Sequence, residues 1–247
     1  MAAIHNPKII TDGLQISLEA GDVNSYPGSG TTWKNLGRKG RGGDGSLTNG
    51  PVHNDAGYFS FDGTNDYCNM GGGDDFFVDN MVFTVECWFN PAGYGDGVYC
   101  LGATRGNASQ RLFDLSHGLD NNYYFHMTNG SGYAVAVQTM LDDYALNTWY
   151  NITMTWDGTT NSNRVIGYVN GGVDAPNAEI KTGTSSIAGS SIFSAYGNTT
   201  KTFFVGAQSN NSYSFNGKMG AFRYYNIEFT PEEVQSNFEA QRHKYGI

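Results

Sequence analysis

The sequence has few cysteines, few basic residues and no long hydrophobic segment. Its 247 residues include only three cysteines, Cys68, Cys87 and Cys100, with no CxxC motif, which argues against a disulfide scaffold or a zinc site. Lys and Arg number 14 against 23 Asp and Glu, and the net charge of −9 argues against binding to nucleic acid. Because no run of about 18 apolar residues is present, we expect no insertion into a membrane.

The beginning of the chain also lacks a recognisable export signal. The first residues, MAAIHNPKIITDG, contain neither a basic region nor the apolar stretch that follows it in a secretory signal. We therefore expect the protein to be made in a cytoplasm without a signal peptide. An extracellular location is the alternative, because a removed signal would leave the same start.

Motifs of known catalytic sites are missing as well. The sequence contains no GxSxG, HExxH or Walker motif. Glycoside hydrolysis needs two carboxylates about 5–9.5 Å apart, and a Glu-x-Asp-x-Glu strand would supply them. Glu86 instead stands alone on its segment, and Asp142 and Asp143 would point to opposite faces of a strand. We expect no enzymatic activity; a glycosidase with an unrecognised carboxylate pair is kept as an alternative.

Most of the chain shows the two-residue alternation of β-strands, interrupted by turns rich in Gly, Asn and Asp. In segment 83–89, Thr84, Glu86 and Trp88 lie opposite the apolar face, and in 149–156 we expect Asn151 and its alternating neighbours to face outward. Many short strands with one apolar face each predict an all-β fold of two sheets packed on a shared core. Further strands are expected at 14–18, 58–62, 66–70, 110–116, 122–128, 134–140, 164–170, 203–207 and 218–226.

One helix is expected near the end of the chain, at 231–244. Thr230 is its N-cap, Pro231 occupies the first helical position, and Glu233 completes a capping box. Apolar residues at i, i+4 spacing form a narrow stripe, and Gly246 follows as a stop. We expect this helix to lie across one edge of the sandwich.

No change in composition suggests a second domain. We therefore expect a single domain over 13–247, preceded by an arm at 1–12 that could anchor the protein to a neighbour. Segments 34–50 and 180–202 are rich in Gly or in Ser, Thr, Gly and Asn, and each is interpreted as a surface loop, the second with a short strand at 192–193.

A cluster of oxygen-bearing side chains lies around one turn, in segment 61–67. It comprises Asp62, Thr64, Asn65 and Asp66. Calcium prefers six to eight oxygen ligands, including carbonyls and waters, so Asp62 and Asp66 are candidate calcium ligands. The alternative is an Asx turn, in which Asp62 binds backbone N–H groups.

Two segments of loop-like composition combine aromatic rings with amide or carboxylate groups, which is the chemistry of a sugar site. The same residue types occur in adaptable protein-binding loops and at sheet edges without a ligand. The candidate glycan-binding residues are Tyr94, Asp96, Tyr99, Asn122, Tyr123 and Tyr124.

Several short motifs follow one another along nearly the whole chain and end at the capped last helix. They are DGL (12–14), SYPGSGTTW (25–33), GSLTNG (45–50), FDGTNDY (61–67), FTVECWF (83–89), WYNI (149–152) and GKMGAFRYYN (217–226). This ordered series resembles the laminin-G-like branch of the concanavalin A-like lectin/glucanase superfamily.

The resemblance implies a two-sheet antiparallel jelly-roll sandwich whose members bind glycans or proteins, some with calcium near the strand that carries Asp62. Asn35 stands where many relatives carry Asp, and Gly220-Ala221 stands where they often carry an acidic pair. The catalytic carboxylate motif of the glucanases is missing.

The form of the SYPGSGTTW motif is especially similar to structural proteins of tailed bacteriophages. This resemblance implies a virion protein on the capsid or tail, a non-catalytic attachment or decoration module that contacts other virion proteins and forms homo-oligomers. The alternative is a lectin-like module that binds host or surface glycans, with or without calcium. No cofactor is expected to be required.

Overall fold

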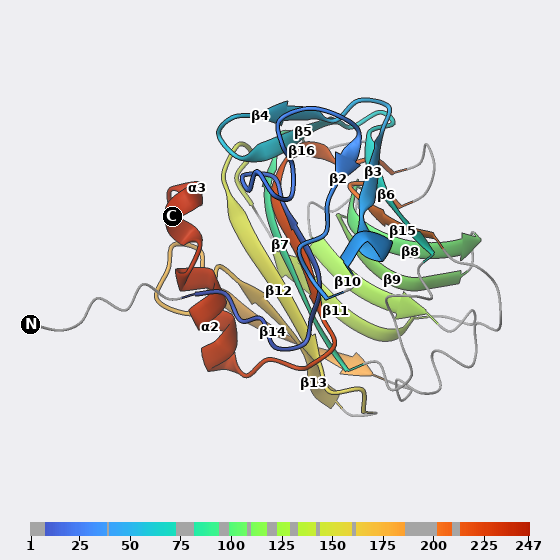
Figure 1. The fold of residues 1–247 in the computed structure, drawn as a ribbon. Coiled ribbons are helices and arrows are strands. Elements are labelled where there is room, and N and C mark those ends of the chain that lie inside the picture. The colour runs from blue at the N-terminus through green and yellow to red at the C-terminus, as the bar shows by residue number, and fades with distance from the viewer. Residues whose placement is uncertain are drawn as a thin grey trace, which may run out of the picture.

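Sixteen strands account for most of the described chain and form a sandwich of two antiparallel layers (Figure 1). The computed structural model describes residues 8–38, 40–72, 82–93, 99–107, 110–117, 123–128, 133–141, 144–159, 162–185, 202–208 and 213–247. The all-β sandwich expected from the sequence is confirmed. No helix in these ranges is long and apolar enough to cross a membrane.

The first layer is built around β7 and β16, the two strands with the most extensive pairing. Residues 216–219 at the start of β16 pair with β5, and residues 221–225 pair with β1. The end of β1 and the start of β5 therefore meet opposite Gly220. The strands of this layer are β14 (Glu179–Ser185), β13 (Ser162–Val169), β12 (Tyr150–Trp156), β7 (Phe83–Pro91), β16 (Asn216–Tyr225), β5 (Tyr58–Asp62), β4 (Val52–Asn54) and β1 (Leu14–Glu19).

The second layer lies across the core from the first. It joins the first layer at one side, where β11 pairs with β14 through Val135–Ser185 and Ala136–Thr184. Its strands are β2 (Thr32–Trp33), β3 (Gly45–Thr48), β6 (Tyr67–Gly72), β15 (Thr202–Val205), β8 (Tyr99–Asn107), β9 (Gln110–His117), β10 (Tyr123–Thr128) and β11 (Tyr133–Leu141).

Aromatic rings fill the space between the layers. Phe83 of β7 packs on Phe125 of β10 with ring centroids 5.7 Å apart, and Phe203 of β15 packs on Phe222 of β16 at 5.5 Å. The apolar faces expected for 83–89 and 149–156 all belong to this core. Cys68 and Cys87 are buried free thiols, which confirms that these two cysteines act as small core residues.

The outer face of the first layer is covered by two short helices, α2 (Pro231–Glu239) and α3 (Arg242–Tyr245). The cap of α2 is as expected: Thr230 and Glu233 form the complete capping box. The expected single helix is wrong, because the chain breaks at Ala240–Gln241 before α3, which ends at Gly246 with φ of 74°.

The expected position of the helix is also wrong. Phe238 of α2 and Tyr245 of α3 pack on Trp88 in the middle of β7, so the helices lie on a sheet face and not across an edge. Asn151, which was expected to face outward, is consequently buried, and so is Glu86 on the same outer face of the first layer. Alternation along a strand defines which residues share a face but does not reveal what covers that face.

Both segments interpreted as loops contain regular structure. Segment 34–50 includes a 3₁₀ helix, η1 (Gly40–Gly43), and β3, and segment 180–202 begins within β14. Residues 192–193 lie outside the described residues. Short strands rich in Gly, Ser and Thr are held by pairing with their neighbours rather than by their own propensity.

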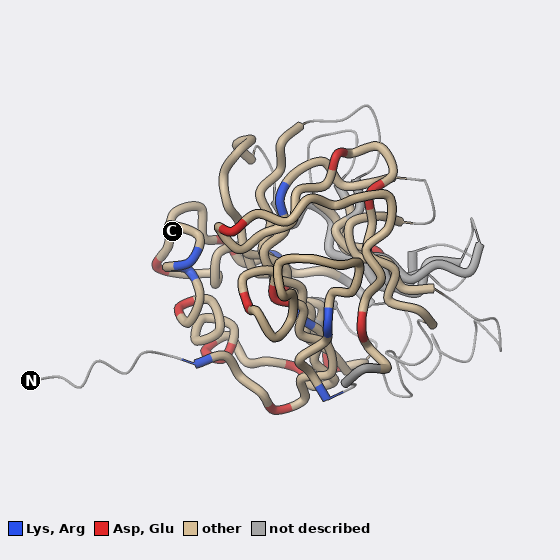
Figure 2. The backbone as a smooth tube through the Cα atoms, turned by 45° about the horizontal axis from the view of Figure 1, so that its top comes forward, with Lys and Arg blue, Asp and Glu red and all other residues tan. Residues whose placement is uncertain are grey.

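The described part of the expected arm, residues 8–12, lies against the C-terminal helices. The backbone N–H of Ile10 donates a hydrogen bond to Oδ1 of Asn237 in α2 (2.7 Å), and Ile10 packs beside a cluster that includes Val234. Both ends of the described chain therefore meet on the outer face of the first layer, where basic and acidic residues lie close together (Figure 2).

Gly220 allows α3 to approach the sheet. A Cβ atom at this position would lie 2.4 Å from Cε1 and 2.5 Å from the hydroxyl oxygen of Tyr245. The Tyr245 ring therefore occupies the space that any larger residue would need. This explains why glycine stands where the family resemblance led us to look for an acidic pair.

We expect the substitution Gly220→Ala to lower the free energy of unfolding by about 1–3 kcal/mol, because the added methyl group overpacks the contact with Tyr245. Urea denaturation followed by circular dichroism measures this change. Gly42→Ala is the matched control, since a Cβ there meets no atom within 4 Å, and it should change stability by less than about 0.5 kcal/mol. Equal effects of the two substitutions would contradict the packing argument.

Candidate functional site

The loop of Asp62 and Asp66 forms a turn closed by its own hydrogen bonds. Oδ1 of Asp62 accepts hydrogen bonds from the backbone N–H groups of Thr64 (2.7 Å) and Asn65 (3.3 Å). Asp66 is buried, and its Oδ2 accepts a hydrogen bond from the N–H of Asp62 (3.0 Å). This is the arrangement of an Asx turn, the alternative that the sequence left open.

The protonation equilibria of the two carboxyl groups agree with this description. Burial raises the pKa of Asp66; the hydrogen bond from the N–H of Asp62 lowers it, and the negative charge of the Asp62 carboxylate raises it. Burial also acts to raise the pKa of Asp62, but the backbone hydrogen bonds it accepts lower the pKa below its usual value. Among the described residues, no group of three or more His, Cys, Asp or Glu side chains is placed to hold a metal ion. Two carboxylates already engaged by backbone donors fit calcium poorly, since this ion takes six to eight oxygen ligands.

The structure describes the side chains of two of the six candidate glycan-binding residues, Tyr123 and Tyr124. Tyr94, Asp96 and Asn122 lie outside the described residues, and only the backbone of Tyr99, at the start of β8, is described. Tyr123 is 1% exposed and packs in the core, where it offers no ring face to a ligand. Tyr124 is half-buried and its ring stacks on His126, with centroids 5.5 Å apart.

Asn35, the second departure from the family pattern, has a structural role. Its side-chain oxygen accepts hydrogen bonds from the N–H groups of Ser17 (2.7 Å) and Gly37 (2.9 Å), and its amide donates to the carbonyl of Gln15 (3.0 Å). The side-chain amide thus fastens the connection after β2 to β1. Because this role requires both a donor and an acceptor, asparagine suits it better than aspartate.

A buried charge cluster lies between β7, β16, β1 and the C-terminal helices. At its centre is Glu86, which is 1% exposed. Its carboxylate accepts hydrogen bonds from five donors of the described residues: Arg223 Nη1 (2.9 Å), Trp88 Nε1 (3.1 Å), Asn151 Nδ2 (3.1 Å), Asn237 Nδ2 (3.3 Å) and Gln241 Nε2 (3.4 Å).

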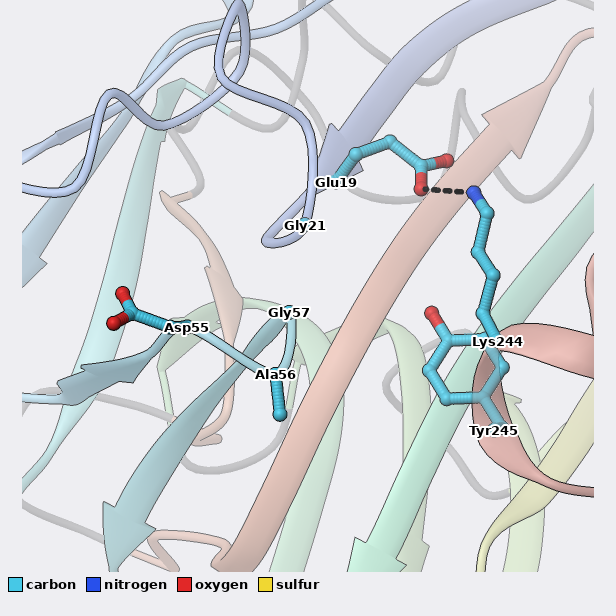
Figure 3. Close-up of a pocket in the computed structure, with 7 residues that line it drawn as sticks. All are labelled: Glu19, Gly21, Asp55, Ala56, Gly57, Lys244 and Tyr245. Atoms are coloured by element: carbon cyan, nitrogen blue, oxygen red, sulfur yellow. Dashed lines mark ion pairs between the residues drawn. The ribbon is translucent and has the colours of Figure 1, made fainter.

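Arg223 connects this carboxylate to a second one. Its guanidinium is fully buried and pairs with Glu86 through Nη1 and with Glu19 through Nη2, which also contacts Gln241. Glu19 in turn lies 3.8 Å from the ammonium group of Lys244, measured from Oε2 to Nζ (Figure 3). Two acidic and two basic side chains therefore neutralise one another across four elements of the fold.

Burial is the dominant influence on the protonation of this cluster. It raises the pKa of Glu86 to about 7, against the lowering effect of the hydrogen bonds from Trp88 and Asn151. Burial lowers the pKa of Lys244, and the neighbouring charge of Arg223 lowers it further. A carboxylate that is buried, paired and surrounded by donors suits a structural role, because no substrate can reach it.

Two cavities flank the ion pair between Glu19 and Lys244. The smaller, about 260 Å³, lies between this pair, Tyr245 and the turns that contain Gly21 and Gly57 (Figure 3). The larger, about 450 Å³, has Arg223 in its wall and extends toward Lys8 and Leu36. Glu19 and Lys244 line both cavities and so separate them.

Aromatic rings continue from the covered face to the rim of the smaller cavity. Tyr245 and Phe238 both stack on Trp88, with centroids 4.2 Å and 5.5 Å away and interplanar angles of 14° and 4°. Tyr245 also contacts the half-buried Trp149 (4.7 Å), which in turn contacts Tyr58 (6.0 Å). These contacts form a row of rings that starts with Phe238 of α2 and ends with Tyr58 of β5.

Glu19, Arg223 and Tyr245 were not predicted from the sequence as members of the charge cluster or of the cavities. Their contacts join residues far apart in the chain: Arg223 and Glu86 are separated by 137 positions. Two features of the sequence could have indicated the cluster. Arg223 lies within the apolar strand MGAFRYY, and Trp88 lies on the face of β7 that was expected to be polar.

We expect Glu86→Gln to lower the free energy of unfolding by about 3–5 kcal/mol, because it leaves the buried guanidinium of Arg223 without one of its partners. Urea denaturation measures the change. The matched control is Glu239→Gln, whose ion pair with Arg242 (2.9 Å) lies near the surface and should contribute less than about 1 kcal/mol. Similar losses in the two variants would show that the Glu86 pair is not specially stabilising.

We expect Asp62→Ala to cost about 1 kcal/mol of stability through the loss of its backbone hydrogen bonds. The cost should be the same with 1 mM calcium, roughly a thousand times the dissociation constant of a micromolar site, and with EDTA. Asp157→Ala is the control, since Asp157 caps a comparable turn by accepting hydrogen bonds from the N–H (3.0 Å) and Oγ1 (2.7 Å) of Thr159. A larger loss in calcium for Asp62→Ala alone would identify a calcium site.

Comparison with solved structures shows the same fold in proteins of low sequence identity. The Trypanosoma rangeli sialidase in complex with 2,3-difluoro-KDN matches 99% of this chain with a TM-score of 0.66 and 15% identity. The binding domain of botulinum neurotoxin serotype D matches 94% with a TM-score of 0.64 and 13% identity. The chain covers 36% of the sialidase and 53% of the toxin domain. No curated protein sequence matches it.

A family model supports the relationship at the level of sequence. It describes the concanavalin A-like lectin/glucanases superfamily and matches residues 62–235, well over half of the chain. The match includes all of β7, β12 and β16, the central strands of the first layer. The chain therefore belongs to the laminin-G-like family of the concanavalin A-like lectin/glucanases superfamily.

Proposed function

We propose that this chain is a non-catalytic attachment module of a bacteriophage particle, and that it binds a glycan. Membership of the concanavalin A-like family supports a binding role. The receptor-binding domain of the botulinum neurotoxin C/D mosaic serotype has the same fold, with a TM-score of 0.61 at 13% identity. The phage part of the proposal rests on the resemblance of the SYPGSGTTW motif to structural proteins of tailed phages.

The observation that carries the non-catalytic assignment is the pairing of Glu19 and Glu86 with Arg223. A glycosidase needs one carboxyl group that donates a proton and one that acts as base or nucleophile, both facing the sugar. Glu86 is enclosed by five donors and does not line either cavity. Glu19 does line both cavities, but its two oxygens are engaged by Arg223 and Lys244.

A glycan is the ligand best suited to the surface around the cavities. Carboxylate, ammonium and phenol groups stand beside half-buried aromatic rings in this region. Such a combination provides hydrogen-bonding partners for sugar hydroxyls and apolar surface for the C–H groups of a sugar ring. The proposed binding requires no cofactor.

The glycan part of the proposal is tested by a glycan array with the purified protein, once with calcium and once with a chelator. We expect specific binding in both buffers, and no release of reducing ends when the bound glycan is incubated with the protein. Binding lost in chelator would make calcium part of the site. Product release would contradict the non-catalytic assignment, and a folded protein that binds nothing would contradict the glycan ligand.

The phage part needs a separate experiment. Mass spectrometry of purified particles of the phage that encodes this chain should detect it at a fixed ratio to the major capsid or tail protein. Its absence from washed, infectious particles would contradict a virion role and leave the binding module as a free or secreted protein.

A further inference from the structure

The smaller cavity lies at a junction that the topology of the first layer creates. β1 and β5 share the same edge of β16, and the gap between the end of one and the start of the other falls opposite Gly220. The turns that continue from these strands touch through glycines: a Cβ on Gly57 would lie 3.1 Å from Cα of Gly21. Backbone therefore forms one wall of the cavity, and α3 forms the other.

The end of β1 and α3 together present groups of complementary hydrogen-bonding character to the cavity. The ammonium group of Lys244 can only donate, and the carboxylate of Glu19 can only accept. The hydroxyl of Tyr245 points into the space between Glu19 and Gly57 (Figure 3) and makes no hydrogen bond with any described residue. A hydroxyl held in this way is available to a ligand as donor and as acceptor.

The charges and the size of the cavity favour a neutral, polyhydroxylated ligand. Of the three charged residues that line the cavity, Glu19 and Lys244 carry opposite charges 3.8 Å apart, and the carboxylate of Asp55 points away from them (Figure 3), so the lining does not select strongly for an anion or a cation. The volume of about 260 Å³ is below the roughly 300–1,000 Å³ of sites for drug-sized molecules, which suits one sugar ring. Trp149 and Tyr58, next to Tyr245 in the row of rings, add apolar surface for a neighbouring residue of the same glycan.

We propose that this cavity is a subsite for one hexose ring of a neutral glycan, in which adjacent hydroxyls bind Tyr245, Glu19 and Lys244. The inference deepens the proposed glycan-binding function and rests on it. It places the subsite at the β1–β5 junction and on α3, on residues other than the candidates that the sequence suggested.

Two substitutions each remove one hydrogen-bonding group from the subsite and keep the ring of Tyr245 that packs on Trp88. Tyr245→Phe deletes the hydroxyl and keeps the ring that stacks on Trp88, and Lys244→Met deletes the ammonium group and keeps most of the aliphatic stem. Each should weaken binding of the glycan found on the array by about tenfold, the effect expected for one lost hydrogen bond. Tyr213→Phe, at an exposed tyrosine that lines neither cavity, is the matched control and should leave the affinity unchanged.

A second measurement identifies the site independently of the array. ¹H–¹⁵N correlation spectra are recorded during titration with glucose, galactose, mannose and N-acetylglucosamine, and all three variants are checked for the same melting temperature as the parent protein. We expect shifts of the backbone amides of Gly21, Gly57 and Tyr245 with at least one sugar, reduced in Tyr245→Phe.

The outcomes separate the subsite from the function. Shifts confined to other residues, or glycan affinity unchanged in both Tyr245→Phe and Lys244→Met, would overturn the subsite and leave a glycan-binding module. No shift with any sugar together with no binding on the array would overturn both. An equal loss of affinity in Tyr213→Phe would show that the effect is not specific to the cavity.

Discussion

The arrangement of the outer face depends on the buried guanidinium of Arg223. A charge that is fully removed from water must be paired and hydrogen-bonded, because its desolvation costs several kcal/mol. Arg223 is paired through Nη1 with Glu86 on the neighbouring strand and through Nη2 with Glu19 on the strand at its other side, while its Nε has no partner among the described residues. These two contacts fix β7, β16 and β1 relative to one another on their outer side, as aromatic packing does on the inner side. Asn237 and Gln241 reach the same carboxylate from the C-terminal segment, so the position of the helices follows from the same cluster.

Close packing at glycines gives this face its shape. Gly220 admits the ring of Tyr245, and Gly21 and Gly57 bring two turns into backbone contact. Because Gly21 and Gly57 carry no side chain, the contact between the two turns is made by backbone alone. The smaller cavity lies beside this contact. A family pattern with acidic residues in place of Gly220-Ala221 could not hold α3 in the same position, so the departure from the pattern and the cavity have one physical origin.

The sequence predicted the fold better than it predicted the site. Strand 83–89 was found at Phe83–Pro91, and 58–62 at the same residues, because period-two alternation is a local property. The capping box of α2 is local as well and was also predicted.

The docking of α2 and α3 on the sheet was not predicted, because the outer face of β7 gives no indication that a helix covers it. The Asp62 loop illustrates an intermediate case: its residues fitted both a metal site and a turn, and the hydrogen bonds of Asp62 and Asp66 are those of a turn. Glu19, Glu86, Arg223 and Lys244 come from four elements, and only the tertiary fold brings them together.

The C-terminal helix α3 links the stability of the fold to the proposed recognition of a glycan. Four residues are too few to form a stable helix alone, so its conformation is imposed by the contacts of Tyr245 with Trp88 and Gly220 and of Lys244 with Glu19. The same two side chains supply the hydroxyl and the ammonium group of the cavity. Binding groups that are fixed by packing lose little conformational freedom when a ligand arrives, which favours affinity in a small site. Trp88 and Arg223 do not line the smaller cavity. They thus determine, through the position of α3, whether the cavity exists in a form that can bind.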